Sequence, residues 1–441
     1  MAIFNKKINS FQIILLGFIA VVLIGSLLLM LPVSSSTGQV THFKDASFTA
    51  VSAVCVTGLV VKDTATYWSE FGQFIILILI QIGGLGVVSV AAIFAMLTGK
   101  NINLKTRSLM QDAISAPKVG GIVRITRFIV ILTICFEAIG ALVMMPTFCG
   151  EYGSKGVWMS IFHSISAFCN AGFDIMGSEK AKFVSLTQYA DNPVINITIM
   201  VLIVVGGIGF LVLHDIKDNK LHFSRYRLHT KIVLVTTAIL ILVPAIIFFF
   251  KQYGDLPMGK RTLASLFQAI TPRTAGFNTM DMTKLNDGNK MITTMLMLVG
   301  GSPGSTAGGM KTVTIAILLV NAISVLKRRG EAEIFKRRIE GSALRTASAI
   351  FFYYIGLFTL CSVAISALDK LPIAKCMFET ASALGTVGLS LGITPGLSVA
   401  SRTILMILMF LGRVGGLTII FAAISKSGDV SKLPKEDVIV G

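Results

Sequence analysis

The sequence predicts an all-α integral membrane protein in which four pseudo-symmetric helix–pore-loop–helix modules contribute eight spans around one pore. The first indication is composition: 54% of the residues are hydrophobic and 14% are charged, whereas soluble domains carry about a quarter charged residues. Several apolar stretches also reach the ~20 residues that cross the hydrocarbon core of a bilayer. The second indication is a short motif that recurs four times, in register, between these stretches.

Eight apolar stretches are candidate spans. They lie near residues 11–31, 71–97, 123–146, 193–213, 230–250, 289–326, 343–368 and 402–425. The first stretch is longer than the ~7–15-residue apolar core of a signal peptide, so we expect a retained helix. The modules then cover residues 1–97, 98–213, 214–326 and 327–425, followed by a cytoplasmic tail at 426–441.

The net charge of +17 is distributed unevenly along the chain. Lys and Arg cluster in alternate loops, with six in 98–127, five in 217–231 and seven in 327–345. Such alternation is the positive-inside pattern of membrane proteins. It predicts a multi-pass protein of the cell membrane with both termini in the cytoplasm, surrounded by lipid, and it argues against nucleic acid as a partner.

The outer stretches between paired spans contain the strongest internal similarity. They align on one glycine each, namely Gly58, Gly172, Gly276 and Gly388. The period of roughly 110 residues is too long for a solenoid repeat, so each copy is a whole two-span module. Small residues recur in the helix that follows, which favours close helix packing. They are Gly83-Gly84, Gly206-Gly207 and Gly300-Gly301, and the fourth copy has Gly412-Arg413 at the same depth.

Each outer stretch is expected to form a short helix followed by a tight, non-helical segment. Such backbone is tolerated at membrane depth only when it is buried in protein or lines water. Four segments can surround one axis, with carbonyl oxygens replacing the hydration shell of a cation and helix C-terminal ends favouring its charge. The candidate ion-binding residues are Val56, Thr57, Gly58, Asn170, Ala171, Gly172, Thr274, Ala275, Gly276, Thr386, Val387 and Gly388.

The residue types in these segments match a potassium filter imperfectly. Thr386-Val387-Gly388-Leu389 is similar to the Thr-Val-Gly-Tyr of potassium channels, but only the glycine is shared by all four copies. We therefore expect one regular ring of carbonyls and real but weaker selectivity for potassium over sodium. Three acids follow the glycines at short range and are candidates for concentrating cations, although turn acids in solvated loops are the favoured alternative. They are Asp63, Asp174 and Asp281.

The third module contains the best candidate for a gate. Six Gly or Pro residues in ten cannot form an ordinary helix, given ~1 kcal/mol per Gly and ~3 kcal/mol for Pro. We expect a flexible loop under the filter rather than a kinked packing helix. It comprises Gly300, Gly301, Ser302, Pro303, Gly304, Ser305, Thr306, Ala307, Gly308 and Gly309, with Lys311 after it.

An arginine within the last apolar stretch is the second candidate gate element. Arg413 has long apolar flanks, which make snorkelling to the interface difficult. It is expected either to donate to carbonyls of the loop or to act as an electrostatic barrier below the filter. Glu137 is also intramembrane, and the sequence identifies no partner for it.

With these motifs, the chain resembles the Trk/Ktr/HKT superfamily of potassium transporters, and most of all the Ktr-type bacterial membrane subunit. The resemblance implies potassium uptake through the four glycines, gating by residues 300–309, and Arg413 below the filter. It further implies a homodimer docked on a cytoplasmic ring of nucleotide-binding regulatory subunits of the RCK type. Sodium dependence is a trait of part of the group, and nothing in these residues predicts it.

Two other classes of protein are alternatives to a potassium pore. A secondary carrier, such as a cation symporter with broken helices, is the main alternative, but repeats of the same topology suit a fourfold pore better. A membrane enzyme would need a nucleophile–base pair or metal ligands, and neither the five histidines nor the six cysteines have such spacing. We therefore expect no enzyme and no organic cofactor, and potassium bound only by filter carbonyls.

Overall fold

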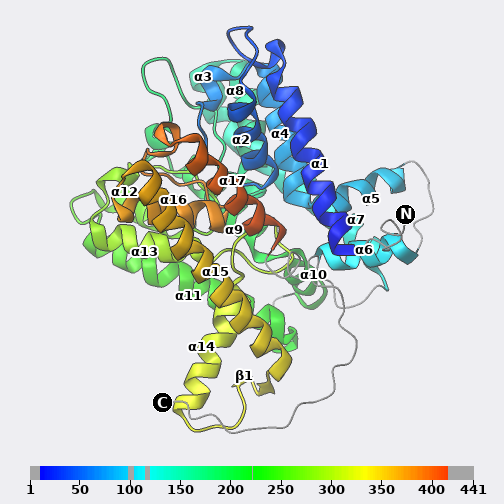
Figure 1. Ribbon diagram of the computed structural model, residues 1–441. Coiled ribbons are helices and arrows are strands. Elements are labelled where there is room, and N and C mark those ends of the chain that lie inside the picture. The colour runs from blue at the N-terminus through cyan, green and yellow to red at the C-terminus, as the bar shows by residue number, and fades with distance from the viewer. Residues whose placement is uncertain (1–9, 98–103, 115–119, 221, 416–441) are drawn as a thin grey trace.

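The computed structural model describes residues 10–97, 104–114, 120–220 and 222–415. The predicted tail at 426–441 and the first residues of the chain lie outside these ranges. The regular secondary structure of the described residues is helical apart from one short β-hairpin, as Figure 1 shows. The fold class is the predicted one, an all-helical membrane protein made of repeated modules.

Each module has a long first helix, a pore helix and a second helix. The first two modules contain α1 (Ser10–Met30), α2 (Phe43–Val54), α3 (Thr64–Tyr67), α4 (Glu70–Leu85), α5 (Val87–Leu97), α6 (Leu104–Ile114), α7 (Ile122–Tyr152), α8 (Lys155–Phe168), α9 (Pro193–Ile208) and α10 (Phe210–Asn219). The last two contain α11 (Leu228–Lys251), α12 (Met258–Ile270), α13 (Asp287–Leu298), α14 (Thr312–Leu326), β1 (Glu333–Ile334), β2 (Arg337–Arg338), α15 (Gly341–Asp369), α16 (Ile373–Gly385) and α17 (Val399–Val414).

The four first helices are the uninterrupted spans. In the described part of the chain, α1, α7, α11 and α15 are each long and apolar enough to cross a membrane. Most of their surface is not covered by protein: between 22% and 33% of their most apolar windows is buried. Exposed apolar residues on these helices, such as Ile24, Leu142, Ile246 and Phe352, are therefore expected to face lipid.

The second helices begin in the same way in all four modules. The residue before α4, α9, α13 and α17 caps the helix, because its side chain accepts a hydrogen bond from a backbone N–H in the first turn. A Ser or Asn at this position satisfies a donor that the helix cannot. The capping residues are Ser69, Asn192, Asn286 and Ser398.

These second helices are not the straight spans that the sequence predicted. The predicted span 71–97 is two helices, α4 and α5, bent by 97° at Gly86, and 193–213 likewise bends by 94° between α9 and α10 at Gly209. Both glycines have positive φ, 84° and 102°, which ends a helix and which other residues adopt with difficulty. The helix α17 ends before Gly415 (φ 88°), and the rest of the predicted span 402–425 lies outside the described residues.

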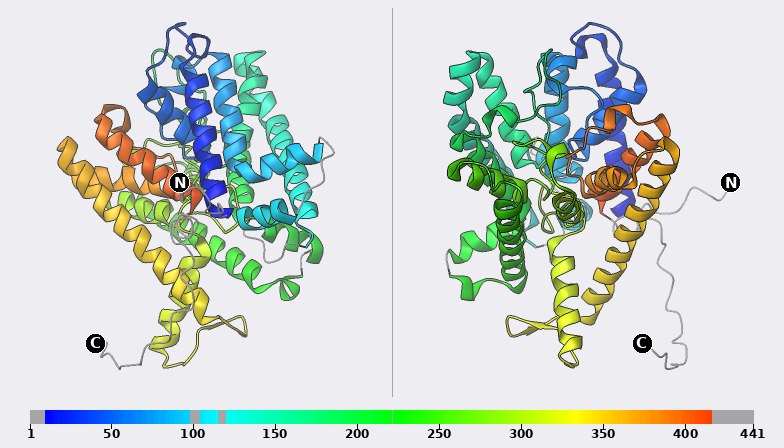
Figure 2. Two further views of the ribbon diagram at one scale, coloured as in Figure 1. Left: turned by 45° about the vertical axis from the view of Figure 1, so that its right-hand side comes forward. Right: turned by 90° about the vertical axis from the view of Figure 1, so that its left-hand side faces the viewer.

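In the first, second and fourth modules, the pore helix packs against both the first and the second helix of its own module. One glycine in each of these second helices makes this packing possible, namely Gly83, Gly206 and Gly412. A Cβ at any of them would collide with a carbonyl oxygen at the end of the pore helix α2, α8 or α16. The first and last modules also touch, since α17 packs against α2. The modules therefore close into one bundle, visible from two further directions in Figure 2.

One part of the chain extends away from this bundle. Helix α14, the β1–β2 hairpin and the start of α15 project together beyond the other helices (Figures 1 and 2). The hairpin pairs Glu333 with Arg338 and Ile334 with Arg337. It lies in the segment 327–345, whose basic residues indicated a cytoplasmic loop.

Candidate functional site

The four pore helices end in the same local backbone conformation. The residue two before each filter glycine is left-handed: φ is 56° at Val56, 59° at Asn170, 69° at Thr274 and 52° at Thr386. The glycines themselves have φ of 88°, 67°, 83° and 95° in chain order, whereas the residue between has no positive φ. A residue with a left-handed backbone ends a helix. Residues with positive and negative φ in alternation turn successive peptide groups toward a common side.

Backbone N–H groups of the filter are bonded back to the pore helices. Thr57, Ala171 and Val387 donate to the carbonyl oxygens of Ser52, Ser166 and Ser382 at 2.8, 2.7 and 2.8 Å, and Ala275 donates to Thr271 at 3.0 Å. The Ser52 and Ser382 hydroxyls also accept from Gly58 and Gly388. The serine that the sequence repeats six residues before three glycines is therefore the anchor of the filter backbone.

The carbonyl groups of the filter are left without protein partners. No residue that the structure describes donates a hydrogen bond to any carbonyl of the twelve predicted filter residues. All twelve are buried except Gly388, which is partly exposed. Because buried carbonyls almost always have a partner, these oxygens require a water or a cation.

The four glycines form a closed ring. A Cβ built on Gly58 would lie 2.5 Å from the Ala171 oxygen, and one on Gly172 would lie 2.6 Å from the Ala275 oxygen. A Cβ on Gly276 would collide with the Val387 oxygen, and one on Gly388 with the Thr57 oxygen. The ring thus runs through the modules in chain order and returns to the first, with one carbonyl oxygen at each junction.

The four copies of the filter differ in side chain. The Thr57 and Thr386 hydroxyls are buried and have no hydrogen-bond partner among the described residues. The Asn170 side chain instead lies 3.3 Å from Thr274 Oγ1, an arrangement best satisfied with the amide oxygen as acceptor. Two orphaned hydroxyls therefore add to the unpartnered oxygens that an ion or water can satisfy.

The predicted gating loop lies against the inner end of the filter. Residues 299–311 contain no helix between α13 and α14, and a Cβ on Gly308 would collide with Thr386 Oγ1. Backbone bonds hold the loop to the second helices of other modules: Ser302 N donates to Gly207 O at 2.9 Å, and Gly309 N donates to Gly412 O at 3.1 Å. The loop is thus held directly under the filter.

Two cationic side chains bind the carbonyls of this loop. Arg413 donates to Thr306 O in the loop and, in the first module, to Gly83 O and to Gly84 O at 3.0 Å. Lys311 Nζ donates to the carbonyl oxygens of Ala307 at 2.7 Å and Gly308 at 3.3 Å. This geometry matches the first of the two roles expected for Arg413, which is to donate to carbonyls of the loop.

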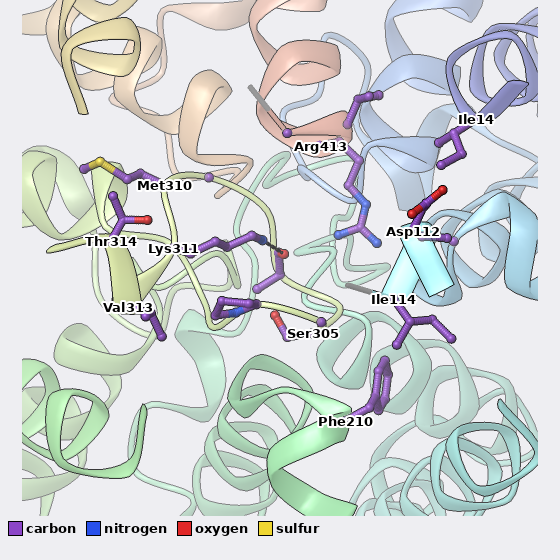
Figure 3. Close-up of a pocket in the computed structure, with 18 of the residues that line it drawn as sticks. Ile14, Asp112, Ile114, Phe210, Ser305, Met310, Lys311, Val313, Thr314 and Arg413 are labelled. Carbon is purple, nitrogen blue, oxygen red and sulfur yellow. Dashed lines mark hydrogen bonds between the residues drawn. The ribbon is translucent and has the colours of Figure 1, made fainter. Parts of the chain in front are cut away.

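Cavities lie on both sides of the filter and loop. An inner cavity of about 410 Å³ is lined by the loop together with Arg413 and Lys311. Figure 3 shows these two side chains reaching into the same space from different elements, with Asp112 and Phe210 at its other walls. An outer cavity of about 310 Å³ is lined by all four filter glycines. The narrow region between the cavities is the filter and the loop.

The three candidate acids all line the outer cavity. Asp63 also caps α3 through Thr66 N and accepts from Phe183 N at 2.7 Å. Asp281 accepts from the Thr283 hydroxyl at 2.7 Å and from Thr283 N, and these bonds lower the pKa of Asp281. These two have the structural role of turn acids. Asp174 differs, because burial and the nearby Asp63 outweigh its bond to Met176 N–H and raise its pKa to about 7.

The sequence did not reveal the partner of Glu137, the Asp45–Arg402 pair or the buried Glu379. Glu137, which had no identifiable partner, lies 3.3 Å from Gln81 Nε2. Arg402 of α17 pairs with Asp45 of α2 at 3.1 Å, and no sequence signal connects residues so far apart. Glu379 lies fully buried in α16; its alignment with His163, nine residues before a filter glycine, was a signal that could have found it.

Comparisons with known proteins agree with this architecture. A family model described as "TrkH: Cation transport protein" matches residues 3–433. The chain is 38% identical to the Ktr system potassium uptake protein B of Bacillus subtilis over 98% of this chain and 96% of that protein. It is 36% identical to the potassium/sodium uptake protein NtpJ of Enterococcus hirae over 99% and 98%.

A solved structure matches the fold as well. The potassium transporter TrkH from Vibrio parahaemolyticus superposes with a TM-score of 0.75 at 18% identity, covering 96% of this chain and 86% of that one. Members of the matching family are membrane ion transporters and not enzymes. The chain therefore belongs to the TrkH family of cation transport proteins.

Proposed function

We propose that this protein takes up potassium ions through the ring formed by Gly58, Gly172, Gly276 and Gly388. The observation that carries the proposal is the set of twelve filter residues whose carbonyls have no hydrogen-bond partner in the described structure. Rings of carbonyl oxygens replace the hydration shell of a cation. The names of the two relatives, both potassium uptake proteins, support potassium as the ion.

Selectivity is expected to be moderate. The junction carbonyls of Thr57, Ala171, Ala275 and Val387 form one regular level of the filter. The level below is irregular, because its four positions are occupied by Val56, Asn170, Thr274 and Thr386. Asn170 pairs with Thr274, and the Thr386 hydroxyl has no partner among the described residues. One regular ring supplies fewer equivalent oxygens than the stacked rings of a symmetric channel, so we expect a preference for potassium with measurable sodium entry.

Gating is assigned to the loop 299–311. With the loop under Thr386 and bonded to Gly207 and Gly412, an ion leaving the filter meets backbone rather than the inner cavity. Opening requires the loop to move and therefore to break its bonds to Gly207, Gly412 and Arg413. A gate held by a few hydrogen bonds of ~1–3 kcal/mol each can be shifted by a regulatory partner.

The proposal includes orientation and partners. We place both termini in the cytoplasm on the evidence of the basic loops. By resemblance to the Ktr type, we propose a homodimer on a cytoplasmic ring of nucleotide-binding subunits. This chain has no phosphate-binding motif of its own, so nucleotide control has to come from another subunit. Sodium is assigned as a second ion because one relative is named a potassium/sodium uptake protein.

A secondary carrier is the alternative function. The bends of 97° and 94° in two second helices favour it, because broken helices are common in carriers. The closed glycine ring favours a pore instead, since alternating access does not require four equivalent backbone segments to meet. The two mechanisms differ in rate and in coupling to a second ion.

Rubidium-86 uptake into liposomes that contain the purified protein tests the proposal. We expect uptake that added potassium suppresses strongly and sodium suppresses weakly, and that Gly276→Ser abolishes without loss of folding. Equal suppression by sodium and potassium would refute a selective filter. Uptake that saturates at a few ions per second and requires a sodium gradient would favour the carrier.

A further inference from the structure

The position nine residues before each filter glycine lies on the pore helix. It is occupied by Thr49, His163, Phe267 and Glu379 in chain order. Thr49 bonds only to its own helix, through Asp45 O at 3.0 Å, and Phe267 is apolar. The other two side chains face the segment that follows the filter glycine. The residue at this position therefore differs among the four modules, whereas the filter glycine is the same in all four.

Glu379 binds the segment after Gly388 through several donors. It has no exposed surface. Its carboxylate accepts from the Ser390 hydroxyl and from Thr394 Oγ1 at 3.0 Å, and the backbone N–H groups of Leu391 and Ile393 are directed at it as well. A buried carboxylate is costly unless such donors satisfy it, so these contacts make its burial possible.

The residues that Glu379 holds belong to the outer mouth. Ser390 follows Gly388 by two residues, and both it and Thr394 line the outer cavity. Ser390 Oγ also accepts from Gly392 N at 2.8 Å, so the turn is fixed through the same hydroxyl. On the inner side, Ser382 holds the N–H groups of Val387 and Gly388. The filter strand of the fourth module is thus attached to α16 on both sides of its glycine.

The second module has a weaker version of this attachment. His163 Nε2 accepts from Ile175 N at 3.4 Å, and Ile175 lies three residues after Gly172, as Leu391 does after Gly388. The second and fourth modules are opposite one another in the ring. The segment after the filter glycine is therefore bonded to its pore helix in one opposite pair of modules, and Glu379 makes more of these bonds than His163 does.

We propose that Glu379 is a positioning residue for ion selectivity, which holds the Val387 and Gly388 carbonyls in register with the other three modules through Ser390 and Thr394. This inference rests on the proposed potassium filter. Because a ring discriminates between cations by the position and stiffness of its oxygens, loosening one quarter of the ring admits sodium. Glu379 acts without touching the ion.

The test compares Glu379→Gln and Ser390→Ala with the matched control Thr49→Val, which changes the same pore-helix position in the first module. Each variant is purified and reconstituted, its thermal unfolding is measured in detergent, and rubidium-86 uptake is recorded against potassium and sodium competitors. We expect each of the two variants to lower the potassium-over-sodium ratio by roughly tenfold, as for loss of a charged hydrogen bond. Thr49→Val is expected to keep the wild-type ratio.

The double variant Glu379→Gln/Ser390→Ala separates positioning from general destabilisation. If the two residues act through one contact, the double variant has the ratio of either single variant; independent structural damage would multiply the two losses. A wild-type ratio in folded Glu379→Gln overturns this inference while leaving the potassium filter intact. A wild-type protein that does not distinguish the two ions overturns the filter and this inference together.

Discussion

Each filter glycine combines a positive φ with a carbonyl oxygen of the neighbouring module close to any added side chain. At Gly172, both obstacles are present: a φ of 67° and the Ala275 oxygen at 2.6 Å from an added Cβ. In contrast, Gly356 lies in the helix α15 with nothing within 4 Å of an added Cβ. The same substitution thus has opposite consequences at the two sites.

We expect Gly172→Ala to abolish rubidium uptake and Gly356→Ala to preserve it. In the filter, the methyl group must displace the carbonyl of the neighbouring module, whereas in α15 alanine favours the helix by up to ~1 kcal/mol. Uptake by the two reconstituted variants, normalised to folded protein, makes the comparison. Normal uptake by Gly172→Ala would mean that the ring does not enclose the conduction path.

Asp174 predicts a dependence on external pH. Its pKa of about 7 means that the carboxylate is charged above that pH and neutral below it. Because a negative charge in the outer cavity concentrates cations, uptake from dilute rubidium should fall as the outer pH decreases from 8 to 6. In Asp174→Asn, uptake should equal the low-pH wild-type value at both pH values. A wild-type pH response retained by this variant would assign the titration to another group.

At the scale of secondary-structure elements, the sequence predicted one of the breaks in the second helices but not the other two. The loop at 300–309 was predictable, because six Gly or Pro residues in ten exceed what a helix tolerates. The bends at Gly86 and Gly209 were not, because single glycines are common in straight membrane helices. Each bend occurs at a glycine with positive φ, close to a glycine pair that packs on a pore helix. The spacing of apolar residues in the sequence does not indicate either feature.

The loop also allows the two roles considered for Arg413 to be separated. Arg413→Lys keeps the positive charge but loses the fork that donates at once to the loop and to Gly83 and Gly84. If the arginine restrains the loop, Arg413→Lys and Arg413→Gln should both raise resting rubidium uptake, by about tenfold for one charged hydrogen bond. If it is an electrostatic barrier, uptake should rise only in Arg413→Gln. Stopped-flow or isotope uptake without regulatory subunits measures the difference.

For the whole molecule, the fourfold arrangement could be predicted from the register of four glycines, but its closure could not. Adjacent modules are joined by the chain, whereas the first and fourth meet only through tertiary contacts. At that junction Asp45 of α2 pairs with Arg402 of α17 at 3.1 Å, and both side chains are mostly buried, 8% and 17% exposed. Arg402 also donates to Pro395 O at 2.6 Å, in the turn beside the outer cavity.

This pair predicts an asymmetric pattern of stability. Asp45→Asn should lower the free energy of unfolding by about 3 kcal/mol, because it leaves the mostly buried Arg402 without its charged partner. Arg402→Met should cost less, because Lys62 Nζ also lies 3.8 Å from the Asp45 carboxylate. The double variant should lose less than the sum of the two, which a double-mutant cycle from thermal unfolding in detergent measures. Additive losses would show that the two side chains do not interact.

The central claim, that four carbonyls from one chain surround a dehydrated cation, is tested most directly by locating the ion. Crystals of the protein grown in rubidium chloride would be measured for anomalous scattering at the rubidium edge. We predict a peak on the axis of the glycine ring, at equal distances from the oxygens of Thr57, Ala171, Ala275 and Val387. A ring without a peak, in crystals that hold rubidium elsewhere in the protein, would contradict the account.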